Sequence, residues 1–222
     1  MLGVDPSWKP SIKAIHVLAT WGKRFDMLIF VSEKDDAKGS LPIFEVGESL
    51  IGRDHLTAKT MKAFDHVYKH HFEHADWFMK ADDDTYVIVE NLRYFLSEQN
   101  ASEPVYFGHH FTYHVPPQGY FSGGGGYVLS KEALRRFGNR PPDLCFNDTG
   151  AEDVKLGDCM QKLGVKTGDS RDALGRSRFH AFTPERHVHG RFPSFYYGYD
   201  KYEAKMVSLF CCDVRVVLSQ RS

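Results

Sequence analysis

The sequence lacks several features that would assign the protein to a broad class. No run of about 18 apolar residues is present, so the sequence offers no candidate for a membrane-spanning helix. Residues 1–10 lack a basic region followed by an apolar block, so they do not look like a signal peptide. The formal net charge of −1 gives no electrostatic footprint for nucleic acid or for an anionic membrane. A chain of 222 residues can bury one sizeable core, and we expect one domain over residues 1–222.

Cysteine is scarce and does not settle the compartment in which the protein folds. The four cysteines permit three complete pairings. No Cys-x-x-Cys is present, which disfavours a structural zinc site.

The common nucleotide-binding signatures are also absent. The glycine-rich stretch 122–127 is neither a Walker phosphate loop nor the dinucleotide fingerprint. Its four consecutive glycines still permit close approach of a sugar or a diphosphate to the backbone. A flexible turn between two strands is the alternative.

The most informative stretch is Trp77–Tyr86, in which an apolar run short enough for one buried strand ends in Asp82, Asp83 and Asp84. Three carboxylates at the edge of a core are costly unless a cation lies among them. In an extended segment alternate residues face the same way, so Asp82 and Asp84 can both reach one divalent cation while Asp83 meets a sugar or a basic side chain. Oxygen ligands suit magnesium or manganese. A solvated acidic turn before the next helix is the alternative that the triplet alone leaves open.

Hydrophobic periodicity predicts an alternation of helices and strands that is typical of an α/β sheet, with sites at the strand ends. In the first helix, Ile12, Ile15 and Ala19 would lie roughly on one face. The expected helices are 11–20, 53–75, 89–98, one that follows a cap at Ser130, and 152–163. The expected strands are 27–32 and 105–108, and residues 109–119 are expected to form a loop.

At the acidic stretch the sequence resembles the core 1 β1,3-galactosyltransferases, which are inverting enzymes of β1,3-glycosyltransferase family 31. The acidic motif of that family lies in a very similar Trp-Phe-Leu-Lys-Ala-Asp-Asp-Asp-Thr-Tyr-Val context. The likeness continues in family order over about residues 12–213. Its further blocks are Arg53-Asp54, Lys59-Thr60, Lys62-Ala63-Phe64, Asn91-Leu92-Arg93, Tyr106-Phe107-Gly108, Ser122 to Glu132, Glu152-Asp153, Gly168 to Asp172 and Cys211-Cys212.

The resemblance implies a fold and a reaction. The fold would be an α/β nucleotide-sugar transferase domain of the GT-A type, with a mixed central sheet flanked by helices and without the family's first strand. The reaction would be inverting transfer of galactose from UDP-galactose to the 3-hydroxyl of N-acetylgalactosamine on Ser or Thr of a glycoprotein, with Mn²⁺ as cofactor. The resembled enzymes are anchored in the Golgi membrane with their catalytic part in the lumen. We expect this chain to begin after such an anchor, and we consider a homodimer as one assembly.

The resemblance also implies residue roles for catalysis and for the metal. By resemblance, Asp153 would be the general base. It lies in the first turn of a helix, where the dipole keeps it ionised and able to accept a proton. A second capping carboxylate is the alternative for Asp153. Asp82 and Asp84 would hold the metal. Cys145 and Cys159 would form a disulfide.

Other residues would contact the two substrates. By resemblance, Arg53 and Lys59 approach the donor diphosphate, although ordinary surface cations are an equal alternative. By resemblance, Tyr196, Tyr197 and Glu152 would contact the acceptor. The two tyrosine rings suit stacking on a sugar face, and they suit covering a core equally well. Thr149-Gly150-Ala151-Glu152 also has the spacing of a capping box, which would give Glu152 a structural role. The remaining donor contacts would be Asp83, Gly124 and Gly125.

The sequence departs from the family in two places. Phe25 stands where the resembled enzymes have a cysteine, and the strand that carries its partner is missing. Val214–Ser222 contains no histidine, whereas the family has a metal-binding histidine there. We expect that His180, His187 or His189 substitutes, that water fills the position, or that the metal binds poorly.

These departures keep a second function open. A catalytically impaired, chaperone-like relative that binds a partner would also fit the missing strand and histidine. The retained carboxylates Asp82, Asp83, Asp84 and Asp153 favour an enzyme.

Overall fold

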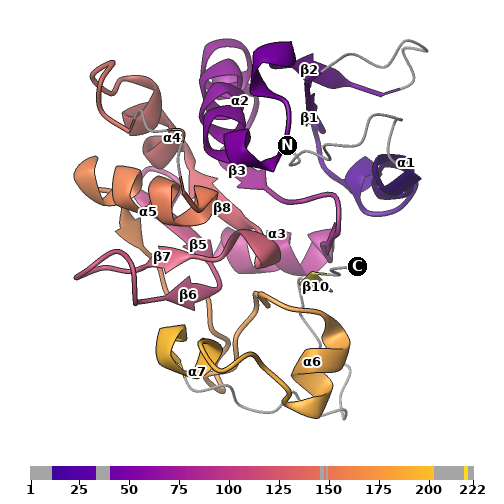
Figure 1. Ribbon diagram of the computed structural model, residues 1–222, viewed down its shortest axis with the longest axis vertical. Helices are drawn as coiled ribbons and strands as arrows, with labels where there is room; N and C mark the ends of the chain where they lie inside the picture. Colours follow the sequence, from indigo (N-terminus) through magenta and orange to yellow (C-terminus); the bar gives the residue numbers. More distant parts are fainter. Residues whose placement is uncertain (1–11, 34–40, 146–147, 149, 203–217, 220–222) are drawn as a thin grey trace.

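The computed structural model describes residues 12–33, 41–145, 148, 150–202 and 218–219. Its architecture is mixed α/β, with helices on both sides of the strands (Figure 1). The main sheet consists of β3 (Trp77–Lys80), β5 (Val105–Gly108), β8 (Tyr127–Ser130) and β9 (Lys166–Thr167). Its order is β3-β8-β5-β9. Because β8 is antiparallel to both β3 and β5 while β5 and β9 are parallel, the sheet is mixed.

Within the described residues, three smaller two-stranded sheets accompany the main one. The parallel pair is β1 (Phe30–Ser32) with β2 (Ile43–Glu45). The antiparallel pairs are β4 (Thr85–Tyr86) with β10 (Leu218–Ser219), and β6 (His110–Phe111) with β7 (Tyr120–Phe121).

The described helices vary widely in length. The α-helices are α1 (Ile12–Ala19), α2 (Leu56–His71), α3 (Val89–Ser97), α4 (Lys131–Gly138), α5 (Glu152–Lys162), α6 (Pro184–His189) and α7 (Tyr196–Tyr199). The 3₁₀-helices are η1 (Gly22–Arg24), η2 (Glu48–Leu50), η3 (Arg53–His55), η4 (Phe72–His74) and η5 (Gly123–Gly125). None of the helices within the described ranges is long and apolar enough to cross a bilayer.

Both faces of the main sheet are buried. Successive strand residues point to opposite faces, so Phe78 and Leu129 pack with α2, α4 and α5, whereas Met79 and Val128 pack with α1 and α3. Burial on both faces explains why β3, β5 and β8 read as nearly continuous apolar runs. The ends of these strands are therefore the places where polar side chains can gather.

Several predicted elements differ from those observed. The helix expected over 53–75 is α2 with a 3₁₀ turn at each end, and the strand expected over 27–32 is reduced to β1. The predicted loop 109–119 contains β6. In α1 the buried residues are Ala14 and Val17, whereas Ile12 is 74% exposed, so the face on which we placed Ile12 and Ile15 faces solvent.

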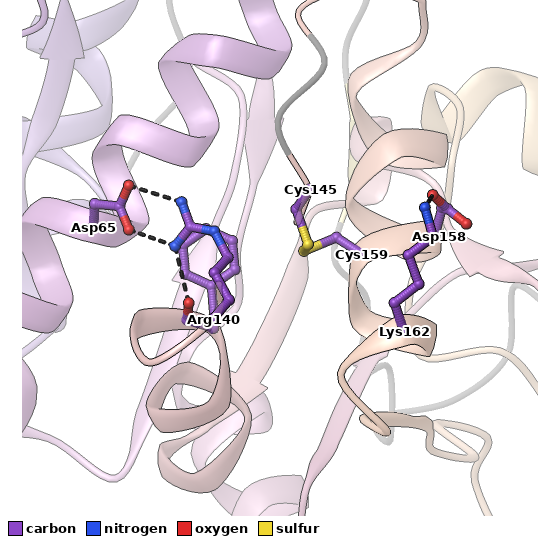
Figure 2. The surroundings of a disulfide bond; sticks show 7 residues. Asp65, Arg140, Cys145, Asp158, Cys159 and Lys162 are labelled. Atoms are coloured by element: carbon purple, nitrogen blue, oxygen red, sulfur yellow. Dashed lines mark hydrogen bonds and ion pairs between the residues drawn. A yellow bond between two sulfur atoms is a disulfide. The ribbon is translucent and has the colours of Figure 1, made fainter. Parts of the chain in front are cut away.

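Cys145 and Cys159 form a disulfide, the pairing implied by the family resemblance. Their Cα atoms are 5.0 Å apart, and the bond ties the segment after α4 to the middle of α5 (Figure 2). Asp158 and Lys162 lie on the same helix and form an exposed ion pair at 2.7 Å. The disulfide helps fix α5, whose first residues belong to the candidate site.

Candidate active site

The acidic triplet forms a turn at the end of β3. The N–H of Thr85 donates to the carbonyl oxygen of Asp82 at 3.1 Å, which closes the turn. The assumption of an extended segment was therefore wrong, and strand alternation does not determine how Asp82 and Asp84 face. All three aspartates are partly buried. The Thr85 hydroxyl donates to the carbonyl oxygen of Gly124 at 3.2 Å, so the turn is held against the glycine-rich stretch.

Lys80, the last residue of β3, brings a buried cation to this turn. Its Nζ donates to Oδ1 of Asp82 at 2.5 Å and lies 3.5 Å from Oε2 of Glu152. Burial alone would lower the pKa of Lys80, but the charges of Asp82 and Glu152 outweigh it and hold this pKa above its usual range. Lys80 is therefore charged in the folded protein.

Glu152 is the buried partner of this lysine. The Tyr127 hydroxyl donates to Oε1 of Glu152 at 2.5 Å. Burial raises the pKa of Glu152, and the charge of Lys80 opposes that rise. The capping-box interpretation was wrong for Glu152, since α5 begins with Ala151 as an N-cap that makes no side-chain cap bond and the Glu152 carboxylate points inward. Thr149 lies outside the described residues.

Asp153 follows in the first turn of α5 and is partly buried. The N–H of Gly123 donates to its Oδ2 at 3.0 Å, and the N–H of Val154 donates to its Oδ1 at 2.9 Å. A methyl group on Gly123 would lie 3.4 Å from Oε2 of Glu152 and 3.6 Å from Nζ of Lys80. The structure thus brings the predicted base Asp153 and the predicted metal ligand Asp82 to one site, with Lys80 between their segments.

The glycine-rich stretch is the third wall of this site. Gly123–Gly125 forms η5, and Gly126 has a φ of +68°, a conformation that favours glycine. A methyl group on Gly125 would lie 2.9 Å from the carbonyl oxygen of His180. These glycines let the backbone pass between β3, α5 and the segment around His180. Gly124 and Gly125, predicted to contact the donor, are themselves buried.

The two predicted donor-binding cations lie in different environments. Arg53 is exposed in η3 at the start of α2. Lys59 is 1% exposed, and its Nζ donates to Oε1 of Glu33 at 2.5 Å and to the carbonyl oxygen of Gly52 at 2.8 Å. A buried, paired ammonium does not fit direct contact with a donor diphosphate. Lys59 instead ties α2 to the segments around residues 33 and 52.

The two predicted acceptor tyrosines are also separated by burial. Tyr196 is 2% exposed and packs with Phe111 and Tyr120. Its ring covers a core, the alternative that the sequence left open, and cannot stack on a sugar in this conformation. Tyr197 is 63% exposed, and its hydroxyl donates to the carbonyl oxygen of Gly190 at 3.1 Å. Its exposed ring face suits contact with a sugar.

None of His180, His187 and His189, each considered as a substitute metal ligand, completes a metal cluster of three side chains within the described residues. The rings of His180 and His187 lie 4.4 Å apart and are both buried, and burial lowers the pKa of each. Within the described ranges, no three His, Cys, Asp or Glu side chains gather so as to hold a metal ion. A Mg²⁺-like ion often binds through one or two carboxylates plus substrate phosphates. Asp82 and Asp84 supply carboxylates of this kind, and Oδ1 of Asp82 is paired with the Lys80 ammonium.

Prediction from sequence missed Lys80, Glu33 and Tyr127 as residues of these buried networks. The available signal for Lys80 was its spacing of two from Asp82, close enough in the chain for the two side chains to pair. Glu33 and Tyr127 carried no such signal, since only the fold brings them to Lys59 and Glu152.

Known proteins match most of this chain. A family model described as Fringe-like matches residues 13–181, a range that includes Asp82, Gly123 and Asp153. Glycoprotein-N-acetylgalactosamine 3-beta-galactosyltransferase 1 of Xenopus laevis is 42% identical over 92% of this chain, which spans 57% of the relative's length. The beta-1,3-glucosyltransferase of Mus musculus is 31% identical over 67% of this chain and 30% of its own length. These similarities confirm the resemblance found in the sequence, and the chain belongs to the Fringe-like family.

Proposed function

We propose that the chain contains the catalytic site of an inverting β1,3-galactosyltransferase. It would transfer galactose from UDP-galactose to the 3-hydroxyl of N-acetylgalactosamine linked to Ser or Thr of a glycoprotein. The observation that carries the proposal is the meeting of Asp82, the Gly123 backbone and Asp153 at one site. Similarity to a galactosyltransferase named for the same acceptor sugar supports the choice of substrates.

The reaction needs a base on the acceptor side, and we assign this role to Asp153. Its carboxylate takes the proton of the acceptor 3-hydroxyl as that oxygen attacks the anomeric carbon from the face opposite UDP. The new carbon–oxygen bond forms as the bond to UDP breaks, and the electron pair leaves with the diphosphate. The N–H of Gly123 orients Oδ2 of Asp153, and the α5 dipole favours negative charge at this position.

On the donor side, we assign Asp82 and Asp84 as ligands of Mn²⁺ and the exposed Arg53 as a contact for the diphosphate. A bound Mn²⁺ would neutralise the charge that develops on the departing diphosphate. Asp83, whose Oδ1 lies 3.9 Å from Nζ of Lys13, is assigned to the donor sugar. Tyr197 is assigned to the acceptor.

We further assign the fold to the GT-A type and the reaction to the Golgi lumen. The mixed α/β sheet with its polar site at the end of β3 supports the fold assignment. The Cys145–Cys159 disulfide supports an oxidising compartment.

The first test is transfer of galactose from UDP-galactose to a peptide that carries N-acetylgalactosamine. We expect Asp153→Asn to lower kcat by about 10²–10⁴-fold, the usual contribution of a general base. Asp158→Asn is a matched control on the same helix, since the Asp158 ion pair is exposed and lies outside the site. Equal activity of Asp153→Asn and Asp158→Asn would contradict the assignment of the base. An inactive wild-type protein that still binds a glycoprotein would support the partner-binding alternative.

A further inference from the structure

We propose that Lys80 is a positioning residue that holds the carboxylate of Asp82 in register with the start of α5, and so with Asp153. The inference rests on the proposed function for the roles of Asp82 and Asp153.

The contacts of Lys80 support this role. The residue is 5% exposed, and its Nζ reaches one carboxylate on the acidic turn and one on α5, at 2.5 Å and 3.5 Å. Asp82 and Glu152 are far apart in the chain but are joined here through one ammonium group. Because Glu152 and Asp153 are neighbours in the first turn of α5, any movement of the turn relative to α5 changes the Lys80 contacts.

The hydrogen bond to Oδ1 also limits the rotation of the Asp82 carboxylate. Metal-ligating carboxylates are generally hydrogen-bonded to partners outside the metal, and loss of such a partner weakens metal binding. Lys80 is such a partner if Asp82 binds the cation as proposed.

The network around Lys80 is arranged to keep it in place. Glu152 also accepts a hydrogen bond from the Tyr127 hydroxyl at 2.5 Å, so the α5 end of the bridge has a second anchor. Tyr127 lies on β8 directly opposite Lys80 in the antiparallel ladder. Lys80, Tyr127 and Glu152 therefore connect the two strands to the helix through side chains that are all buried.

A purely structural alternative is that Lys80 only neutralises the buried Glu152. The single variant Lys80→Met does not separate the two roles, because it leaves Glu152 buried without a cation and destabilises the fold. The double variant Lys80→Met/Glu152→Gln removes both charges at nearly constant volume, and the amide oxygen that replaces the carboxylate can still accept from the Tyr127 hydroxyl. It therefore restores charge balance without restoring the hold on Asp82.

The experiment compares wild type, the single and double variants, and the matched control Lys162→Met, which removes an exposed lysine from α5. Thermal unfolding is measured first, then Mn²⁺-dependent UDP binding by calorimetry, then kcat and KM for transfer. We expect the double variant to unfold near the wild-type temperature, yet to bind Mn²⁺–UDP about 10- to 100-fold more weakly. Its kcat should fall, while KM for the acceptor and all properties of Lys162→Met stay near wild type.

Two negative results are distinguishable. In the first, wild type binds Mn²⁺–UDP and transfers galactose, and the double variant matches it in affinity and kcat. Lys80 then serves only to balance the charge of Glu152, and the inference is overturned while the proposed function stands. If wild type neither binds UDP with Mn²⁺ nor transfers galactose, the proposed function fails and the inference fails with it.

Discussion

At the scale of single residues, the site depends on the buried ion pair between Lys80 and Glu152. Glu152 is buried, but its two oxygens meet the Tyr127 hydroxyl and the Lys80 ammonium. Asp82 and Asp153 are only partly buried, so their carboxylates border the solvent-accessible side of the same network. The buried pair joins β3 to α5, and the partly exposed carboxylates of Asp82 and Asp153 are the ones to which the proposed reaction assigns roles.

The buried side chain of His187 makes the stability of the fold depend on pH. Burial lowers the pKa of His187 from its ordinary 6.5 to about 4. The unfolded chain therefore binds more protons than the folded one between these values. The contribution of His187 is complete above pH 6.5 and is lost as pH falls, by about 2 kcal/mol at pH 5.

Chemical unfolding at pH 7 and at pH 5 measures this effect. We expect the free energy of unfolding to fall with pH in wild type and to fall by less in His187→Gln, which keeps a polar side chain but does not titrate in this range. An equal loss in the two proteins would show that His187 is not the titrating group.

Residue roles were harder to predict from the sequence than residue positions. The sequence pointed to the acidic triplet and to Asp153, which the structure places at one site. It did not point to Lys80, because a lysine beside aspartates is typical of a solvated turn. The capping-box pattern misassigned Glu152, since a local pattern carries no information about a lysine 72 positions earlier in the chain.

At the scale of elements, the 3₁₀ turn Gly123–Gly125 decides how closely β3, α5 and the segment around residue 180 approach. The carbonyl oxygen of Gly124 accepts a hydrogen bond from the Thr85 hydroxyl, and the N–H of Gly123 donates one to the Asp153 carboxylate. A methyl group on Gly125 would lie 2.9 Å from the carbonyl oxygen of His180, whereas one on Gly123 would make only ordinary contacts at 3.4 Å or more. Gly125 is therefore needed for spacing, whether or not it touches the donor.

The variant Gly125→Ala tests this spacing. Its methyl group would lie 2.9 Å from the carbonyl oxygen of His180, so backbone has to move. We expect a loss of about 1–3 kcal/mol in the free energy of unfolding, as for other overpacked sites, together with reduced transfer activity. Gly198→Ala is the control, because a methyl group there meets nothing within 4 Å. If both variants behave like wild type, the close contact at Gly125 does not restrict the site.

Hydrophobic periodicity predicted some elements and failed at others for a physical reason. In α3, Val89, Leu92, Phe95 and Leu96 are all buried, as expected, because the helix has one clearly apolar stripe. The shorter α1 has apolar residues on two faces, and packing selected the face with Val17 over the face with Ile12. Periodicity cannot make that choice, since the packing partners of α1 lie far away in the sequence.

At the scale of the whole molecule, the site is assembled from three separate parts of the chain. The end of β3, the turn before β8 and the start of α5 come together because the antiparallel β3–β8 pairing places Lys80 beside Tyr127 (Figure 1). The resemblance in the sequence predicted the mixed α/β fold and the family. It could not predict the burial of Lys59 and Tyr196, which depends on the packing of distant segments.

The proposed reaction requires above all that the acidic turn bind a divalent cation together with the diphosphate of a nucleotide sugar. Calorimetric titration of the protein with UDP, with and without Mn²⁺, is the sharpest test of this requirement. We expect UDP binding that requires Mn²⁺, is lost in Asp84→Ala and is unchanged in the surface control Asp158→Ala. Binding of UDP that is independent of Mn²⁺ and of Asp84, or no binding at any Mn²⁺ concentration, would refute it.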